Sequence, residues 1–479
     1  MSTDPRDIIS KSAMSRFQII AVGLTIGLNA LDGFDVLSIS FASPGIADEW
    51  GIDRAALGIV LSMELIGMAI GSMFLGGVAD KIGRRPTMLG CLVVMAVGMF
   101  MVTTSNGILG GIVAPVIAFL FAIDLDVRLT DLSIWRIITG LGIGGMLAAI
   151  NAVAAEFSNY KRRDLSVSLM SIGYPIGAVV GGMITAQLLQ GNDWRAIFYF
   201  GSAVTLAFIP LVYFFVPESV HWLTRKQPAG ALERINHTLK RMGHAAVPAL
   251  PVISAANRKR SVGDIFGPAL LATTICVTAA YFFHITTFYF ILKWVPKIVV
   301  DMGFVASSAA GVLVWANVGG ATGGAVVGLL TQRYNVKKIT ITVMLLSTVM
   351  VTLFGQTGPD LVQLSMICAA AGFCTNGAIT GMYAIFAKAF PTHVRAFGTG
   401  FAIGIGRGGS VLAPIIAGFL FTGGLALQWV AFVMALGSLV AAGVLMMLKL
   451  KPETPEGVSA ETREDLGGEF SGAVATQGR

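Results

Sequence analysis

The sequence has little charge: Asp, Glu, Lys and Arg make up 12% of its 479 residues, against about 25% in an average soluble protein. Hydrophobic residues make up 55%, so the composition indicates a polytopic membrane protein. The formal net charge is +7, but the positive residues stand in short loops between apolar runs. The charge therefore does not indicate a nucleic-acid partner.

Cysteine is scarce too, and no disulfide is expected from its positions. The sequence has four, each inside an apolar run and without metal-site or redox spacing: Cys91, Cys276, Cys368 and Cys374. No cluster of His and Cys and no nucleophile constellation stands out. We therefore expect no metal site, no cofactor and no enzyme activity.

Twelve apolar runs are long enough to cross a bilayer, because about 20 residues at a rise of about 1.5 Å span a hydrocarbon core of about 30 Å. The expected fold is an all-α membrane protein with twelve transmembrane helices. The runs are 17–42, 54–79, 86–104, 131–157, 165–190, 195–216, 266–292, 305–331, 338–356, 361–389, 396–421 and 427–448.

The distribution of Lys and Arg predicts the orientation of these spans. With the N-terminus inside, 26 of the 33 positive residues lie in cytoplasmic segments, as the positive-inside rule requires. Both ends are then cytoplasmic. Residues 105–130 include a further apolar stretch, but a thirteenth span there would place the basic loops 81–85 and 161–163 on opposite sides. We expect an extended or re-entrant outer segment instead.

The two halves of the chain repeat a glycine pattern. Gly67, Gly71 and Gly76 recur 252 residues later, each set followed by a basic turn. Such a repeat predicts two pseudo-symmetric six-helix bundles with a binding site between them. The second set is Gly319, Gly323 and Gly328.

The expected division of the chain follows from the spans and the polar segments between and beyond them. The linker contains a candidate amphipathic helix with Leu232, Ile235, Leu239 and Met242 on one side. The division is an N-terminal cytoplasmic segment (1–16), a first bundle (17–216), a cytoplasmic linker (217–265), a second bundle (266–449) and a disordered cytoplasmic tail (450–479).

Two carboxylates stand in the middle of the first span. Asp32 and Asp35 are three residues apart and share one helix face, and acids inside a membrane are functional candidates by default. Arg136 in the fourth span lies at a matching depth by the helical rise. We expect it to pair with the aspartates, either as a fixed structural pair or as a switchable one that also binds a substrate carboxylate.

Further polar and aromatic groups are candidates for a substrate site. Arg407 stands among glycines in the eleventh span, and Glu64 is a weaker candidate or a structural hydrogen-bonding residue. We expect Lys293 and Lys297 to reach the outer interface, where they either anchor the span or gather anions. The other candidates, each with a packing or structural alternative, are Phe34, His284, Tyr289, Trp315, Asn317, Asn376 and Tyr383.

Charged residues near the cytoplasmic ends of the spans predict a network that holds helices in one state. Because they lie beside basic loops at the expected cytoplasmic face, we interpret them as gating and topology residues rather than substrate ligands. They are Asp80, Arg84, Arg85, Glu156 and Arg163.

The stretch Gly76-Gly77-Val78-Ala79-Asp80-Lys81-Ile82-Gly83-Arg84-Arg85 resembles the loop between spans two and three of the major facilitator superfamily. More narrowly, residues 15–450 are similar to the aromatic acid:proton symporter family. The motifs that carry this resemblance are Asp32-Gly33-Phe34-Asp35, Arg136 with 139–145, 156–163, Gly173-Tyr174-Pro175-Ile176-Gly177, and Arg407.

The resemblance implies uptake of an aromatic carboxylate with protons across a bacterial inner membrane, with the two aspartates needed for transport. The expected partners are the substrate, protons and the lipid bilayer, and we expect a monomer. A drug or metabolite:proton antiporter of the same fold is the alternative. Departures from the family pattern are the 105–130 segment, Gln332 in the acidic position of the second loop, and the lysines at 293 and 297.

Overall fold

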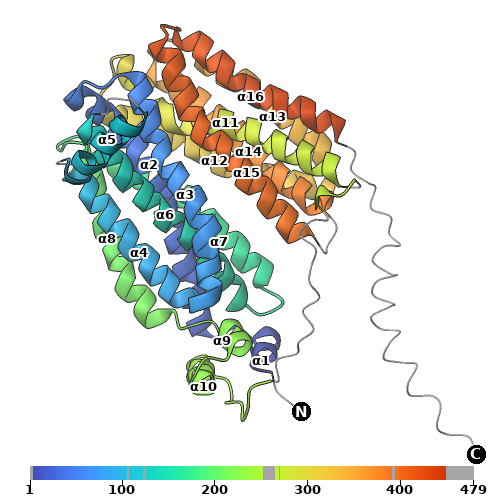
Figure 1. The fold of residues 1–479 in the computed structure, drawn as a ribbon. Helices are drawn as coiled ribbons and strands as arrows, with labels where there is room; N and C mark the ends of the chain where they lie inside the picture. The colour runs from blue at the N-terminus through green and yellow to red at the C-terminus, as the bar shows by residue number, and fades with distance from the viewer. Residues whose placement is uncertain are drawn as a thin grey trace, which may run out of the picture.

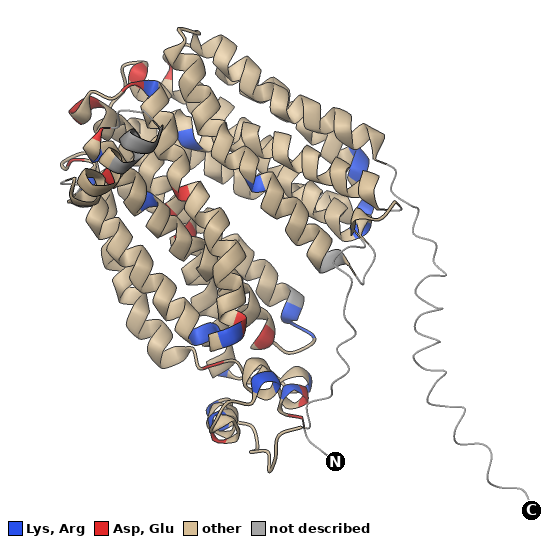
Figure 2. Cartoon of the chain, viewed as in Figure 1, with Lys and Arg blue, Asp and Glu red and all other residues tan. Residues whose placement is uncertain are grey.

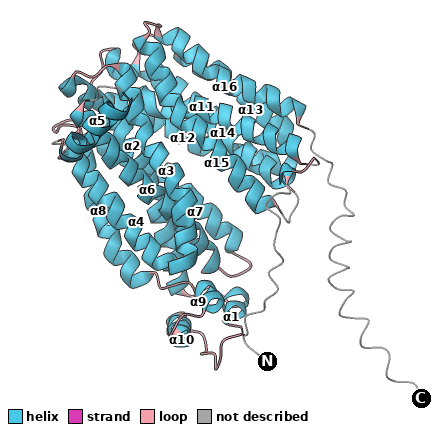
Figure 3. Cartoon of the chain, viewed as in Figure 1, coloured by secondary structure: helices cyan, strands magenta, loops and turns pink. Residues whose placement is uncertain are grey.

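The computed structural model describes residues 4–104, 107–121, 126–251, 265–268, 270–390 and 394–448. Over these residues the secondary structure is helical and contains no strand (Figure 3). Twelve of the described helices are long and apolar enough to cross a membrane. The expectation of an all-α membrane protein with twelve transmembrane helices is confirmed.

The twelve helices form two bundles of six, which lie side by side (Figure 1). The first comprises α2 (Arg16–Trp50), α3 (Arg54–Ile82), α4 (Arg84–Thr103), α6 (Val127–Glu156), α7 (Arg163–Leu188) and α8 (Arg195–Phe215). The second comprises α11 (Leu271–Asp301), α12 (Ala306–Arg333), α13 (Val336–Phe354), α14 (Leu361–Ala389), α15 (Arg395–Thr422) and α16 (Leu427–Met447).

Four shorter helices lie at the ends of the bundles. They are α1 (Pro5–Lys11), α5 (Ile108–Phe121), α9 (Val220–Lys226) and α10 (Ala231–Arg241). Lys and Arg gather around α1, α9 and α10 (Figure 2), and we call that end of the molecule the basic face. The other end, which carries α5, is called the opposite face.

The first spanning helix is longer than the sequence predicts. Its start is set by a capping box between Ser15 and Gln18, but it continues through Pro44 to Trp50 instead of ending near residue 42. The last turns pack on α8, where Trp50 meets Trp194 edge to face at 5.8 Å. This packing offsets the loss of the backbone hydrogen bond that Pro44 cannot donate.

Within the segment 105–130, for which the sequence predicts an extended or re-entrant outer segment, Ile108–Phe121 forms helix α5. The carboxylate of Asp131 at the start of α6 accepts hydrogen bonds from the backbone N–H groups of Leu109 and Gly110 at 2.9 and 3.1 Å, and so holds the first turn of α5. Helix α5 has 14 residues and extends about 21 Å, less than the thickness of a hydrocarbon core. Residues 122–125 lie outside the described residues.

The repeated glycines make equivalent contacts in the two bundles. A Cβ atom at Gly71 would lie 2.2 Å from the carbonyl oxygen of Leu141, and one at Gly323 would lie 2.1 Å from that of Phe373. These two glycines therefore bring α3 onto α6 and α12 onto α14 at the same position of the repeat. The third pair is looser, with distances of 3.5 Å at Gly76 and 3.6 Å at Gly328.

The segment between the bundles contains the expected amphipathic helix. Helix α10 buries Ile235 and Leu239 in the apolar cluster of the first bundle, and Met242 joins them. Residues 252–264 and the tail from 449 lie outside the described residues, so the expected division of the chain into domains and the disorder of the tail stay predictions.

The glycine contacts give a test of the fold. We expect Gly323→Ala to lower the stability of the purified protein by about 1–3 kcal/mol, because the new methyl group meets a backbone carbonyl that cannot move alone. Gly328→Ala should leave stability nearly unchanged, since the nearest atom is 3.6 Å away. Thermal unfolding in detergent measures both, and equal losses would contradict the packing described.

Candidate functional site

The two bundles contact one another in the half of the molecule near the opposite face. Arg54 on α3 pairs with Asp301 on α11 at 2.9 Å, and the hydroxyl of Ser62 donates to the carbonyl oxygen of Val411 at 2.7 Å. Among the described residues, the polar contact between the bundles that lies nearest the basic face is the hydrogen bond of 3.3 Å from Arg407 to Ser72. The bundles are therefore closed against one another from the opposite face to the middle of the membrane.

The two aspartates of α2 are buried in the middle of the first bundle. The exposed fractions of Asp32 and Asp35 are 2% and 0%, and no oxygen of either carboxylate has a hydrogen-bond partner. They interact electrostatically with one another, and Asp35 also with Glu64 and Arg136. Helix α2 packs tightly on α7 here, because a Cβ at Gly33 would lie 2.1 Å from the carbonyl oxygen of Tyr174.

The expected partner of Arg136 is wrong. Its guanidinium forms an ion pair with Glu64 on α3, and both side chains are fully buried. The contact of Arg136 with α2 is a hydrogen bond of 3.2 Å to the backbone carbonyl oxygen of Asp35 rather than to its carboxylate. Glu64, a weaker candidate in the sequence, is therefore a central residue of the site.

The close approach of α3 and α6 explains this pairing. A Cβ at Gly140 would lie 2.1 Å from the carbonyl oxygen of Glu64, so the two backbones touch one turn after Arg136. The helical rise placed Arg136 at the depth of the two aspartates, but depth does not decide which helix is the nearest neighbour. The glycine contact does, and it places Glu64 beside the guanidinium.

Lys293 also differs from the expectation. Its ammonium group does not reach the outer interface but is fully buried, where it donates to the backbone carbonyl oxygen of Val36 and lies 3.5 Å from the carboxylate of Glu64. Lys297 pairs with Asp301 on its own helix. The helix ends at Asp301, nine residues beyond the predicted end of this span. The span was predicted to end before Lys293, but the charge of Lys293 can be buried because it is paired with Glu64.

Arg407 stands between the bundles among aromatic side chains. Its guanidinium donates to the hydroxyl of Ser72 on α3. Three tyrosines of α7 and α11 lie near it: Tyr174, Tyr281 and Tyr289. The ring of Tyr281 packs against α15 beside Arg407, because a Cβ at Gly406 would lie 2.2 Å from that ring.

The tyrosine cluster extends to α14. The hydroxyls of Tyr281 and Tyr383 are 3.4 Å apart. Tyr281 is buried, whereas Tyr383 is 47% exposed. A guanidinium beside several phenols offers what an aromatic anion needs, namely a cation for a carboxylate, hydroxyls for ring substituents and aromatic faces for the ring. Tyr289 and Tyr383 are among the site candidates predicted from the sequence, whereas Tyr174 and Tyr281 are not.

The other predicted substrate residues do not join this cluster. Phe34 points between α7 and α8, where it meets Phe200 edge to face at 5.4 Å. Both ring nitrogens of His284 are bonded, one to Ser438 and one to the carbonyl oxygen of Thr375, so this buried side chain is a hydrogen-bonding residue inside the second bundle.

Three further candidates lie elsewhere on α12 and α14. Asn317 is buried and donates to the carbonyl oxygen of Leu313 on its own helix, while Asn376 packs against Gly320 at the contact of α12 with α14. Trp315 is 53% exposed. The structure therefore brings together Arg407, Tyr289 and Tyr383, whereas no contact described here joins Trp315, Asn317 or Asn376 to them, and their role stays a prediction.

The predicted charge network exists at the basic face of the first bundle. Arg84 bridges Asp80 at 2.8 Å and Glu156 at 3.3 Å, while Arg163 donates to a backbone carbonyl oxygen at the end of α6. The guanidinium of Arg85 donates to the carbonyl oxygen of residue 213. These contacts lie within one bundle, and the gating role of the network stays a prediction.

Glu218 belongs to the same network, although the sequence analysis did not single it out. Its carboxylate accepts the backbone N–H groups of Arg84 and Ser219 at 2.9 and 2.8 Å. It also fills the space beside Gly83, whose φ of +114° favours glycine. Burial, the largest effect, raises the pKa of Glu218. The signal in the sequence was the Pro-Glu-Ser at the end of the sixth span.

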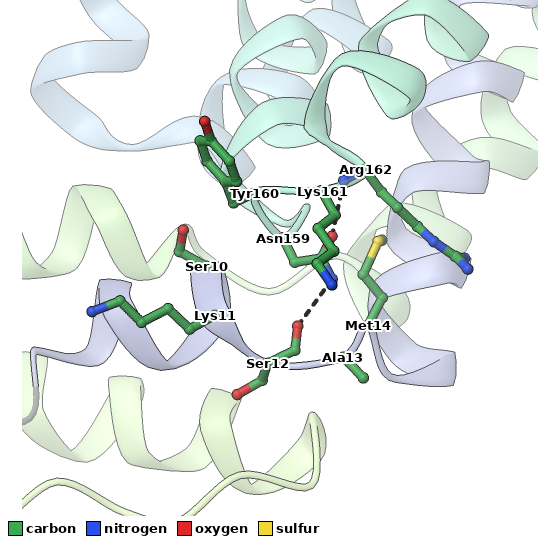
Figure 4. A pocket seen from close by; sticks show the side chains of 9 residues that line it. All are labelled: Ser10, Lys11, Ser12, Ala13, Met14, Asn159, Tyr160, Lys161 and Arg162. Atoms are coloured by element: carbon green, nitrogen blue, oxygen red, sulfur yellow. Dashed lines mark hydrogen bonds between the residues drawn. The ribbon is translucent and has the colours of Figure 1, made fainter.

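The amino-terminal helix is attached to this face. Ile9 of α1 is buried in the apolar cluster of the first bundle, and the backbone N–H of Tyr160 donates to the carbonyl oxygen of Ser10 at 2.9 Å. Beside them, a cavity of about 690 Å³ lies between the α1–α2 and α6–α7 connections (Figure 4). Asn159 borders it and donates to the carbonyl oxygen of Ser12.

The family model of the Major Facilitator Superfamily matches residues 25–354 and 305–476. The chain belongs to the Major Facilitator Superfamily. This facilitator is a multi-pass membrane protein, and the resemblance stated from its motifs is confirmed at this level.

The curated relatives of this facilitator are bacterial aromatic acid transporters, as the narrower resemblance predicts. It is 27% identical to the gallate transporter of Pseudomonas putida over 92% of its own length and 93% of the relative. It is 28% identical to the 4-hydroxybenzoate transporter PcaK of Acinetobacter baylyi over 94% of each chain.

Solved structures of the superfamily share the fold. The partially occluded inward-open structure of the xylose transporter XylE from E. coli matches with a TM-score of 0.66 at 17% identity, over 92% of this chain and 99% of that one. A bacterial homologue of the lysosomal transporter Spinster matches with a TM-score of 0.66 at 13% identity, over 91% and 97%.

The basic face gives a pH test. His221 on α9 is partly buried, and burial, the largest effect, lowers its pKa below the ordinary value. Glu156 and Asp4 oppose this shift, whereas Arg163 and Arg6 add to it. The folded state then binds this proton less readily than the unfolded chain, so the stability associated with neutral His221 is complete above about pH 6.5 and decreases as the pH falls below it.

We therefore expect the attachment of α1 to weaken between pH 7 and pH 5.5. Amide hydrogen exchange of residues 5–11, compared at each pH with the same residues in His221→Gln, measures this change. His237→Gln on the exposed side of α10 is the matched control and should behave as the unmodified chain. A weakening that persists in His221→Gln would contradict the assignment to this imidazole.

Proposed function

We propose that this facilitator is a secondary active transporter that carries an aromatic carboxylate into the bacterial cell together with protons. The observation that carries the proposal is the cluster of Arg407 with tyrosines between the two bundles, in the middle of the membrane. It is supported by the relatives, whose names assign them gallate, 4-hydroxybenzoate and 3-(3-hydroxyphenyl)propionate as substrates. Each of these compounds has one carboxylate and at least one ring hydroxyl.

The proposed orientation follows the distribution of Lys and Arg, with the basic face and both termini in the cytoplasm. The described contacts between the bundles then close the external side, and the structure corresponds to the inward-facing state of an alternating-access cycle. In the other state the same contacts must break and the basic-face ends of the bundles must approach one another.

Arg407 is the proposed ligand of the substrate carboxylate. A guanidinium presents two parallel N–H donors to a carboxylate, and the contact of Arg407 within the protein is a single hydrogen bond to a neutral hydroxyl. Arg136 is less suited to this role, because Glu64 already neutralises it in a fully buried site. The phenols of Tyr281 and Tyr383 then face the ring substituents.

Asp32 and Asp35 are the proposed proton sites. A buried carboxylate without a hydrogen-bond donor is more stable as the neutral acid than as the anion, and neither aspartate has a donor in this state. A transition that exposes α2 to the external solution would let both ionise. Each pH unit supplies about 1.4 kcal/mol per proton, and uptake of a monoanion with one proton is electroneutral.

The first test changes Arg407. We expect Arg407→Gln to raise the KM for uptake of 4-hydroxybenzoate by about 10- to 100-fold, because a hydrogen bond to a charged group contributes about 1.5–3 kcal/mol. Arg54→Gln removes an exposed arginine at the opposite face and is the control, with an expected change within about twofold. Initial rates in intact cells measure both, and an unchanged KM in Arg407→Gln would contradict the assignment.

The second test separates proton coupling from binding. We expect Asp32→Asn and Asp35→Asn each to abolish accumulation driven by an imposed pH gradient in proteoliposomes, while exchange of labelled for unlabelled substrate continues. Exchange needs the site and the conformational change but no net proton movement. Accumulation at the parental level in both variants would exclude these aspartates as the coupling sites.

The antiporter alternative is examined by competition. A site built on Arg407 predicts that benzoate-type acids inhibit uptake and that lipophilic cations do not. Inhibition by lipophilic cations at concentrations where the acids have no effect would favour the drug:proton antiporter instead.

A further inference from the structure

Lys293 connects the two bundles inside the membrane. It belongs to α11 of the second bundle, but both of its polar contacts are with the first: the backbone carbonyl oxygen of Val36 on α2 and the carboxylate of Glu64 on α3. Its side chain is fully buried, as is that of Glu64. We call the contacts of Lys293 with these two residues the Lys293 latch.

The position of the latch matches the closed half of the interface. Glu64 lies two residues along α3 from Ser62, whose hydroxyl is bonded to α15. One turn before Ser62, a Cβ at Gly58 would lie 2.4 Å from the carbonyl oxygen of Pro414 on α15. Opening of the opposite face requires α11 to move away from α2 and α3. The ammonium group must then leave Glu64, its one ion-pair partner among the described residues.

The strength of the latch follows from its environment. An ion pair in a water-free interior is screened far less than one at the surface, and removing one member leaves an uncompensated buried charge. The exposed pair of Arg54 with Asp301 joins the same two helices at the rim, with side-chain exposures of 43% and 26%, and such a pair contributes little. The chain thus contains two ion pairs across one interface that differ in burial.

We propose that Lys293 is a positioning residue for transport that holds the opposite face closed, and that the latch sets the balance between the two states of the unloaded carrier. Glu64 serves both bundles in this arrangement, because Arg136 keeps the carboxylate in place when Lys293 leaves it. The proposal rests on the proposed function for its place in a transport cycle. Closure itself is measured without any substrate.

The test uses a cysteine in the closed interface. Ser62→Cys, in a chain whose four native cysteines are replaced by alanine, places a thiol opposite Val411 on the interface between the bundles. A membrane-impermeant maleimide applied outside intact cells reacts with it only when the opposite face is open. The reaction rate therefore reports the open population and needs no knowledge of the substrate.

Lys293→Met removes the charge but keeps a long side chain. We expect it to raise the labelling rate about tenfold or more, whereas Lys293→Arg keeps the cation and should label near the parental rate. Arg54→Gln is the matched control, with an expected change within about twofold. If Lys293→Met does not reach the membrane, Lys293→Gln replaces it, since the amide keeps a donor for the carbonyl oxygen of Val36.

Transport kinetics give an independent readout. A larger outward-open population should lower the KM for uptake in Lys293→Met, and its maximal rate should fall because closure behind the substrate is weaker. A parental labelling rate in Lys293→Met, or an equal acceleration in Arg54→Gln, would overturn the proposal. If Lys293→Met labels faster but the parental chain takes up no aromatic acid, the result would support the latch while contradicting the proposed function.

Discussion

One carboxylate inside the membrane, Glu64, forms ion pairs with two cations that come from different bundles. Arg136 reaches it from α6 and Lys293 from α11, and all three side chains are excluded from solvent. None of these charges is stable alone in an apolar interior, so the position of each helix depends on the others. Close backbone contacts hold this group in place, together with hydrogen bonds from Arg136 and Lys293 to carbonyl oxygens of α2.

The same arrangement explains why the aspartates of α2 stand without partners. Because the guanidinium of Arg136 pairs with Glu64, the carboxylates of Asp32 and Asp35 have no hydrogen-bond donor. Their protonation state is then sensitive to whatever enters or leaves their surroundings. Under the proposed function this separation assigns the two roles to different residues, since one acid maintains the architecture while the other two are the proposed proton sites.

The sequence predicts some of these features and not others, for a physical reason. Span positions and the internal repeat depend on local composition and spacing, so α3 and α12 and their glycines could be recognised in advance. Depth along a helix is also a local quantity, and it placed Asp32 and Arg136 at one level. The ion-pair partner of Arg136, by contrast, depends on which helices touch and on how they are rotated. It could be recognised only from the packing of α6 on α3 at Gly140.

The position of Lys293 also depends on a contact with another helix. A lysine near the end of an apolar run is typical of a membrane interface, and the span was accordingly ended before it. The helix continues to Asp301 because a carboxylate on another helix accepts the charge. No pattern within α11 records that carboxylate. The tyrosine cluster was recognised in part for a similar reason, since Tyr281 and Tyr174 meet Arg407 only through the contacts of α7, α11 and α15.

The attachment of α1 has a practical consequence. Its apolar side chains are part of the folded first bundle, and the segment that follows it is bonded to the α6–α7 connection. Shortened versions that begin at α2 would expose apolar surface to water and remove bonds from a neighbouring loop. For expression and purification, the amino-terminal helix should therefore be retained, with any affinity tag added ahead of residue 4 through a flexible spacer.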